Sequence, residues 1–328
     1  MIRPGFLVRA GVGAAISVIA IWLLLRSVDL DRTATELSRA DPGWIVVALG
    51  FLLVDLLLRG ARWQRLLRPV ATVRYLAVLA YLFVGYLANN VLPARLGELV
   101  RSHYLGDREG ISRATALGTV VVERAIDLAV VVAIASAALL VLSVRGIVVG
   151  AVVVAGGVAG LLIVAVGLGI AAHRLPGAAR AIGLVERWPM VRGLGQRLQG
   201  GLAVAGRPRT LVETVGLSLV AWGCTLLAFA AAGQAVGLQL TIGQAALLAS
   251  GVALASAVPA GPSNLGTFEL AAVEIAKAIG LPPDPAFALA LIAHASILAL
   301  TSLGGAIALA RIGWRREPTG GSPNAPAT

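Results

Sequence analysis

Residues 114–142 decide the class of fold, and they read ATALGTVVVERAIDLAVVVAIASAALLVL. Such a run can cross a bilayer, which needs roughly 17–25 predominantly apolar residues, and it lacks the alternation of a strand. Further apolar stretches lie at 6–25, 44–58, 75–92, 147–171, 210–236, 242–260 and 284–310. We therefore predict an all-α, polytopic transmembrane helical bundle, with residues 1–316 as a single integral membrane domain and 317–328 as a disordered tail.

The composition of the chain supports the same class. Hydrophobic residues make up 58% and charged residues 13% of the chain, whereas soluble domains average about 45–50% and about 25%. The formal charge of +11 does not indicate nucleic-acid binding, because the Arg residues stand at the ends of apolar runs and form no basic domain with interleaved aromatics. Cys224 is the only cysteine, which excludes a disulfide framework or a thiolate metal cluster within one chain.

The placement of Arg residues predicts the topology, since cytoplasmic loops are enriched in them. We expect a multi-pass protein of the cell membrane, the inner membrane of a bacterium, with both termini cytoplasmic. The 59–74 loop and the Arg-rich 172–209 linker should also be cytoplasmic, the linker being either an amphipathic surface helix or a solvated loop. The 26–43 loop, where acidic and basic residues balance, should be external.

Two apolar stretches conflict with this topology if they are full spans. A complete crossing by 75–92 would leave Arg101, Arg108 and Arg113 outside. A re-entrant hairpin at 75–113, and a second one at 242–283 from the opposite side, removes the conflict. The order of span, hairpin and span then occurs twice in opposite orientations, which is the inverted repeat typical of alternating-access carriers. A kink within an ordinary span is the alternative.

The interruptions of the two hairpins share a pattern. Residues 93–98 read PARLGE and residues 262–269 read PSNLGTFE, so each has Pro-x-x-Leu-Gly followed by a Glu. A proline at a helix start leaves amide donors and the positive dipole end free for a phosphate, and Arg side chains strengthen such a site. The candidate binding residues here are Asn90, Pro93, Arg95, Gly97, Glu98 and Arg101 in the first hairpin and Pro262, Asn264, Gly266 and Glu269 in the second.

Ionisable side chains within apolar runs are costly and need a partner, a cavity or a role. Glu123 and Asp127 share a helix face, and Arg124 can pair with Asp127 at i, i+3. This cluster either ties its helix to a neighbour or lines a polar translocation path. His294 stands without a second His at metal spacing, so hydrogen bonding within the bundle or proton coupling fits it better than a metal. We predict neither a metal site nor a cofactor.

The sequence resembles the membrane region of lysylphosphatidylglycerol synthases, a flippase-like family that also occurs as stand-alone membrane proteins. The resemblance covers about 44–310 and rests on three motifs: Asn90-x-x-Pro93-x-Arg95-x-Gly97-Glu98-x-x-Arg101, Glu123-Arg124-x-x-Asp127, and Pro259-x-Gly261-Pro262-x-x-Leu265-Gly266-x-x-Glu269. Two positions depart from the family pattern, because Asn264 stands where a glycine is expected and His294 where an Arg is usual. The resemblance covers the membrane region and not the soluble aminoacyl-transfer domain that full-length synthases carry after it, so we do not expect lysyl-lipid synthesis.

The resemblance implies a flippase or scramblase for a phospholipid, an aminoacylated phospholipid or a polyprenyl-linked lipid, and we expect no enzyme activity. The headgroup phosphate would contact Arg95, Arg101 or Arg124. No G-x-x-x-x-G-K-[ST] motif is present, so uphill transport would need an ion gradient or a partner. Membrane lipids are the expected partners, while a separate lipid-modifying synthase or glycosyltransferase and a homo-oligomer stay open.

Three other functions remain open at this level. The first is a secondary carrier of a small ion or solute, which an inverted repeat permits equally well. The second is an intramembrane enzyme acting on a lipid phosphate, with Glu98 as base and Ser102 or His103 as nucleophile. The third is a membrane partner of a separate synthase that transports nothing itself.

Overall fold

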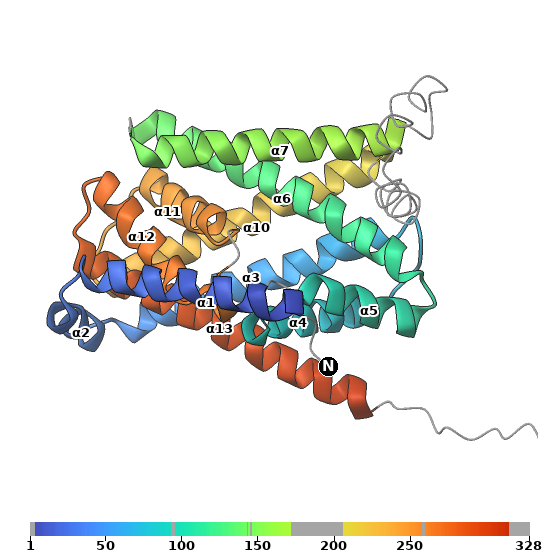
Figure 1. The fold of residues 1–328 in the computed structure, drawn as a ribbon, viewed down its shortest axis with the longest axis horizontal. Coiled ribbons are helices and arrows are strands. Elements are labelled where there is room, and N and C mark those ends of the chain that lie inside the picture. The colour runs from blue at the N-terminus through green and yellow to red at the C-terminus, as the bar shows by residue number, and fades with distance from the viewer. Residues whose placement is uncertain are drawn as a thin grey trace, which may run out of the picture.

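The fold is helical throughout the described part of the chain, as the sequence predicts (Figure 1). The computed structural model describes residues 4–92, 96–142, 144, 146–171, 206–257 and 260–314. These residues form α1 (Pro4–Leu25), α2 (Leu30–Ser38), α3 (Pro42–Leu67), α4 (Tyr75–Val91), α5 (Gly97–Glu109), α6 (Arg113–Leu142), α7 (Ile147–Ala171), α10 (Pro208–Ala235), α11 (Ile242–Ala255), the 3₁₀ turn η3 (Pro262–Asn264), α12 (Thr267–Ala278) and α13 (Pro283–Trp314).

Among these helices, α3, α6, α10 and α13 are each long and apolar enough to cross a membrane. Residues Gly11–Leu25 of α1 meet the same criterion only together with α2, and the two helices are bent by 86° at the break between them. Many large apolar side chains lie on the outside of the bundle, among them Leu140 and Leu161, which are 83% and 73% exposed. Such a surface is stable only against lipid, so the chain is a multi-pass membrane protein.

An inverted repeat relates the two halves of the bundle. In the first half the long helices α3 and α6 flank the short pair α4 and α5, and in the second α10 and α13 flank α11 and α12. The packing matches as well, because α4 packs on α13 as α11 packs on α6, and α5 packs on α6 as α12 packs on α13. The counterparts α3 and α10 run antiparallel: the Asp41 N–H donates to the Ala235 carbonyl at 2.8 Å at one end, and Arg65 pairs with Glu213 at the other.

The short helices form two hairpins at opposite ends of the bundle (Figure 1). We name α4 with α5 hairpin 1, and α11, η3 and α12 hairpin 2. Their tips meet, because the Ser263 hydroxyl donates to the Asn90 carbonyl at 2.8 Å. Hairpin 2 breaks earlier than its apolar run predicts, since α11 ends at Ala255 rather than near 260; the Pro and Gly residues that follow disfavour a helix. The re-entrant placement of both hairpins in the membrane stays a prediction.

Small residues allow close approach at both hairpins. In hairpin 1, the Gly97 N–H donates to the Asn89 side chain at 2.7 Å, and Gly97 lies directly against Gly85. In hairpin 2, the Gly261 N–H donates to Ser17 of α1 at 3.0 Å, so α1 packs against the break. Because lipid supplies no hydrophobic drive for helix association, such close contacts and buried hydrogen bonds hold the helices together.

The ends of the bundle agree with part of the predicted topology. The 26–43 segment is not a plain loop, because it contains α2, capped at its start by Asp29. The end of α3 and the start of α10 lie at one end of the bundle, where Arg65 meets Glu213, as expected for two segments on one side of the membrane. Which end faces the cytoplasm stays a prediction. Most of the 172–209 linker and the 317–328 tail lie outside the described residues.

Candidate functional site

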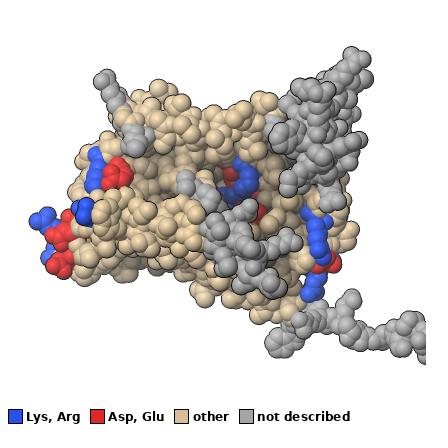
Figure 2. Space-filling model, in the orientation of Figure 1, with Lys and Arg blue, Asp and Glu red and all other residues tan. Residues whose placement is uncertain are grey.

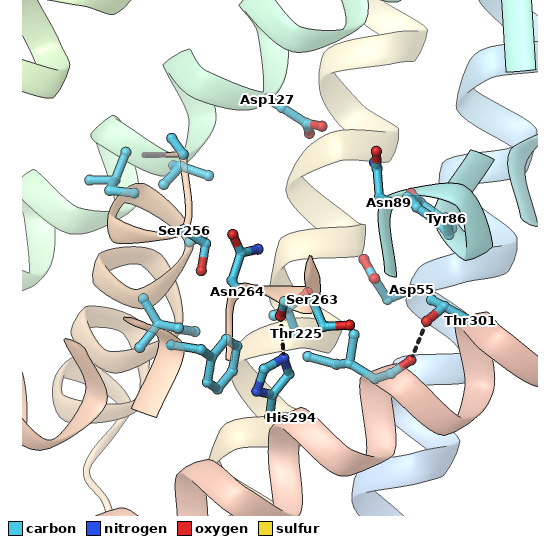
Figure 3. A pocket seen from close by; sticks show the side chains of 18 of the residues that line it. Asp55, Tyr86, Asn89, Asp127, Thr225, Ser256, Ser263, Asn264, His294 and Thr301 are labelled. Carbon is cyan, nitrogen blue, oxygen red and sulfur yellow. Dashed lines mark hydrogen bonds between the residues drawn. The ribbon is translucent and has the colours of Figure 1, made fainter. Parts of the chain in front are cut away.

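A cavity of about 480 Å³ lies between the two hairpin tips and the long helices. Its volume falls within the range of about 300–1,000 Å³ that small-molecule sites occupy. Asn89 faces it from hairpin 1 and Asn264 from hairpin 2 (Figure 3). Apolar side chains of the long helices complete the lining, among them Leu52, Leu128, Val131 and Phe229. The cavity is therefore lined by both polar and apolar side chains.

The cavity holds charges midway along an apolar surface. Figure 2 shows Lys, Arg, Asp and Glu side chains at the two ends of the molecule, and a further group at the bottom of a hollow between them. Arg124 lines the cavity, and its side chain is 39% exposed. In a bilayer, where charged groups are expensive, an accessible Arg at this depth indicates a polar ligand or a path for one.

Arg62 is the centre of the buried charge network. Its side chain is fully buried and binds carboxylates of α6, with Nη2 at 3.0 Å from Glu123 and 2.9 Å from Asp127. Nη1 donates to the other oxygen of Asp127 and, at 2.9 Å, to Ser218 of α10. Because bidentate, charge-assisted contacts are strong and directional, Arg62 locks α3, α6 and α10 together.

Three further Arg residues surround the same carboxylates. Arg59 binds Asp55 at 2.9 Å and lies 3.6 Å from Asp127. Arg101, which reaches in from hairpin 1, binds Glu123 at 3.0 Å. Arg124 binds Glu123 at 2.6 Å and Asp127 at 3.4 Å. With Arg62, four guanidinium groups face these three carboxylates, and a fourth carboxylate, that of Glu98, lines the cavity and interacts electrostatically with Arg124.

Arg124 keeps a hydrogen-bond donor to spare. Among the described residues, the Nε of Arg124 and the Nε of Arg62 are buried side-chain nitrogens without a hydrogen-bond partner. Arg62 is fully enclosed, whereas Arg124 lines the cavity. The exposed part of the Arg124 guanidinium would give an anion in the cavity a charged hydrogen-bond donor. Glu98 also lines the cavity, and the Asn89 amide lies 3.5 Å from its carboxylate.

A second polar cluster joins hairpin 2 to α13. His294 contacts the Glu269 carboxylate through Nδ1 at 2.6 Å and the Ser263 carbonyl through Nε2 at 2.9 Å. The Phe268 ring stacks on the imidazole at 4.2 Å between centroids. The second carboxylate oxygen of Glu269 accepts the Gly266 N–H at 2.8 Å. His294 and Glu269 are both nearly fully buried.

The break in hairpin 2 requires left-handed backbone at two non-glycine residues. Ser263 has φ 58° and Asn264 has φ 56°. The second value explains why a glycine is expected at 264 and why asparagine can replace it, because asparagine tolerates this region better than most residues. The departure from the family pattern therefore keeps the backbone path of the loop while adding an amide to the cavity.

Substitutions at Asn264 test this backbone requirement. Asn264→Gly should leave the free energy of unfolding unchanged or slightly raised. Asn264→Val should lower it by about 1–2 kcal/mol, the cost of a left-handed conformation for an ordinary residue, and should therefore unfold at a lower temperature. Thermal unfolding of the purified variants in detergent, followed by circular dichroism, measures the difference. Equal unfolding midpoints for the Gly and Val variants would contradict the assignment of strain.

The structure brings together most of the candidate residues from the sequence. Lining residues of the cavity are Glu98, Arg124, Asp127, Asn90, Asn264 and His294. Glu123 and Glu269 lie behind it and bind Arg124 and His294, and Arg101 in turn binds Glu123. Gly97 and Gly266 shape the two hairpin breaks through close contacts with α4 and α1. Pro262 starts η3 and is not one of the residues that line the cavity, and Pro93 and Arg95 lie outside the described residues.

The sequence reasoning missed Arg59 and Arg62 and placed them in a cytoplasmic loop. That assignment is wrong, because α3 continues to Leu67 and carries both residues into the bundle. Arg residues were counted as interface markers, but Arg62 is paired with carboxylates of α6, and Arg59 with Asp55 of its own helix and with Asp127 of α6. A signal was available, since Asp55 and Arg59 stand at the i, i+4 spacing of a helical ion pair.

The residues proposed for an intramembrane enzyme do not assemble. The Ser102 hydroxyl is buried and donates to the Glu98 backbone carbonyl at 2.8 Å. The His103 side chain is 52% exposed and contacts Asp107 at 3.2 Å. Of the three residues, only Glu98 lines the cavity.

Comparison with curated proteins finds relatives among archaeal membrane proteins. The "Glycosyltransferase AglD" of Haloferax volcanii is 26% identical over 344 residues, which cover 93% of this chain and 55% of that protein. UPF0104 membrane proteins of Methanocaldococcus jannaschii and Methanothermobacter thermautotrophicus are 26% and 29% identical over 118 and 115 residues. These matches cover 35% and 34% of this chain, and the same shares of the relatives. The chain thus spans about half the length of the glycosyltransferase.

A family model shows where the chain belongs. The model described as "Lysylphosphatidylglycerol synthase TM region" matches residues 11–305, which include both hairpins and all the residues of the charge network. No solved structure matches the chain significantly. Because the match extends over most of the chain, this protein is a member of the lysylphosphatidylglycerol synthase TM region family.

Proposed function

We propose that this protein moves a phosphate-bearing lipid between the two leaflets of the cell membrane. The observation that carries the proposal is the mixed lining of the cavity: charged groups and apolar side chains line one space, between the two charged ends of an apolar bundle. A lipid needs both surfaces, because its headgroup must leave water while its acyl or polyprenyl chains stay in an apolar environment. A phospholipid, an aminoacylated phospholipid and a polyprenyl-linked lipid all meet this description.

Arg124 is the residue best placed to hold the phosphate. Its guanidinium is partly exposed and lines the cavity. Arg binds phosphate strongly because its planar donors match the phosphate oxygens. Glu98 and Asn89, on the hairpin 1 side, offer acceptors for a cationic or hydroxylated part of the headgroup.

The inverted repeat supports transport rather than anchoring alone. Interrupted helices from opposite ends of the bundle meet at the cavity through Ser263 and Asn90. Exchange between two arrangements of these tips would open the cavity toward one end of the bundle and then the other. The relatives support a role in lipid modification, since one is named a glycosyltransferase and the family is named after a lipid synthase. A separate synthase or glycosyltransferase that supplies or uses the lipid is therefore part of the proposal.

Translocation in proteoliposomes tests the proposal. The purified chain is reconstituted with headgroup-labelled anionic, aminoacylated or polyprenyl-phosphate lipids, and the fraction of label that a membrane-impermeant quencher reaches is followed over time. We expect faster transbilayer exchange than in empty vesicles for at least one lipid, and at least about a tenfold loss with Arg124→Gln, because a charged hydrogen bond contributes about 1.5–3 kcal/mol.

The control variant is Arg209→Gln, which removes the same charge from a side chain that is 93% exposed and outside the cavity. It should exchange lipid at the wild-type rate. Exchange at the rate of empty vesicles with all three lipid classes would reject the proposal. Uptake of a soluble organic anion without lipid exchange would instead establish a solute carrier.

A further inference from the structure

The contacts of His294 fix the position of one of its protons. Nε2 lies 2.9 Å from the Ser263 carbonyl oxygen. A carbonyl can only accept, so Nε2 must carry the hydrogen that fills this contact. In the neutral imidazole only one ring nitrogen carries a hydrogen, and Nδ1 would then present a lone pair.

That lone pair would face a carboxylate. Nδ1 lies 2.6 Å from one oxygen of Glu269, and the other oxygen already accepts the Gly266 N–H. Two acceptors do not approach this closely without a hydrogen between them. The pair therefore holds one additional proton, either as imidazolium with carboxylate or as imidazole with carboxylic acid. Both forms are neutral overall, which suits a buried site.

Loss of the shared proton breaks one of the two contacts. If Nε2 keeps its hydrogen, Nδ1 repels Glu269; if the hydrogen moves to Nδ1, Nε2 repels the Ser263 carbonyl. Ser263 holds a left-handed conformation, and its hydroxyl is the contact to Asn90 at the tip of hairpin 1. A proton on the pair thus determines whether the tip of hairpin 2 stays fastened to α13.

We propose that His294 and Glu269 form a proton-binding site that couples lipid translocation to proton movement. The inference rests on the proposed lipid transport. Water at one side of the membrane supplies the proton, which binds between Nδ1 and the carboxylate, fastens hairpin 2 and leaves to water on the other side as the contacts open. No covalent bond other than those to the proton changes.

The charges around the cavity favour loading of the proton and the lipid together. Besides the pair itself, the charged groups that line the cavity are Asp55 and Arg59 of α3, Glu98 of α5, and Arg124 and Asp127 of α6. The described lining residues of α10, α11 and η3 are uncharged. An anionic headgroup at Arg124 would add negative charge to this space and so disfavour the deprotonated pair, which carries one net negative charge, by Coulomb repulsion. The coupling is therefore co-transport, with lipid and proton crossing in the same direction.

Glu269→Gln removes the shared proton but keeps the hydrogen bonds that hold hairpin 2 to α13. A glutamine oxygen can still accept the Gly266 N–H, and its amide can donate to Nδ1 while Nε2 keeps its hydrogen for Ser263. All contacts are then satisfied without a shared proton. The matched control is Glu274→Gln on the same helix, whose carboxylate is exposed and pairs with Lys277 at 2.8 Å.

Nitrogen-15 NMR of histidine-labelled protein in nanodiscs tests the proton site without any transport. The chain has three histidines, and a His294→Gln sample assigns the His294 signals. In wild type and in Glu274→Gln, His294 should show either hydrogen on both ring nitrogens or one strongly shared proton. In Glu269→Gln, only Nε2 should carry hydrogen. A His294 signal of the ordinary neutral form, equal in wild type and Glu269→Gln, would overturn the inference.

A pH gradient across proteoliposomes tests the coupling. With one proton per lipid, a gradient of one pH unit should bias the labelled lipid about tenfold toward the alkaline side, because one unit corresponds to about 1.4 kcal/mol. The bias should reverse with the gradient, persist in Glu274→Gln and vanish in Glu269→Gln. Lipid exchange with no bias in the wild type would reject the coupling alone, whereas no exchange at any pH would reject lipid transport itself.

Discussion

Replacing Arg62 with methionine is expected to destabilise the protein by about 3–5 kcal/mol, the usual cost of removing one partner from a buried ion pair. Arg62 is fully buried and contacts both Glu123 and Asp127 as well as Ser218. Methionine fills part of the same space but leaves Asp127 without its bidentate partner. The free energy of unfolding, measured by SDS titration in mixed micelles with circular dichroism as readout, checks this value.

Arg65→Met is the matched control for Arg62→Met. Arg65 lies one turn further along α3, is 36% exposed in its side chain, and pairs with Glu213 at 3.2 Å. Because exposed ion pairs contribute about 0–1 kcal/mol, its loss should have a small effect. The double variant Arg62→Met with Asp127→Asn should recover part of the stability, since the unpaired charge is gone. Equal losses for the Arg62 and Arg65 variants would contradict a structural role of the buried network.

Gly97→Ala is expected to disrupt hairpin 1. A methyl group at this position would overlap the backbone oxygen of Gly85 and lie 2.6 Å from the Asn89 side-chain oxygen that accepts the Gly97 N–H. The obstacle is backbone, so α4 and α5 must separate, and Arg101 must then withdraw from Glu123. We expect the free energy of unfolding to fall by about 1–3 kcal/mol, the usual cost of an overpacked core. Part of the contribution of the Arg101–Glu123 ion pair should be lost in addition. Thermal unfolding in detergent measures it.

Gly216→Ala adds the same methyl group as Gly97→Ala, but we expect it not to destabilise the protein. Gly216 lies within α10, and a methyl group there meets nothing within 4 Å. Alanine is the better helix former by about 0.8–1.0 kcal/mol, so this variant should be as stable as the wild type or more so. If both glycine variants unfolded at the wild-type temperature, the close contact of Gly97 with Gly85 would be disproved.

The lengths of the apolar runs predicted most of the helices, and the reason is local. The bounds of α6 and α7, for example, fall within one residue of the predicted stretches, because a bilayer requires long apolar runs that end at polar residues. The hairpin breaks were also visible, since Pro and Gly act on the backbone nearest to them. The predictions were poorest where a residue's partner lies far along the chain, as for Arg59 and Arg62.

The sequence by itself determined the class of protein, the positions of the long helices and the two interruptions, because apolar length and backbone restriction act over a few residues. Tertiary structure alone decided which charges belong to one network. Arg62 meets Asp127 across 65 positions, and Ser263 meets Asn90 across 173. In the low dielectric of the bundle, such distant groups stabilise one another only when packing brings them into contact. In the sequence, Arg59 and Arg62 resemble residues that mark a membrane interface, but helix packing places both in the buried charge network beside the cavity.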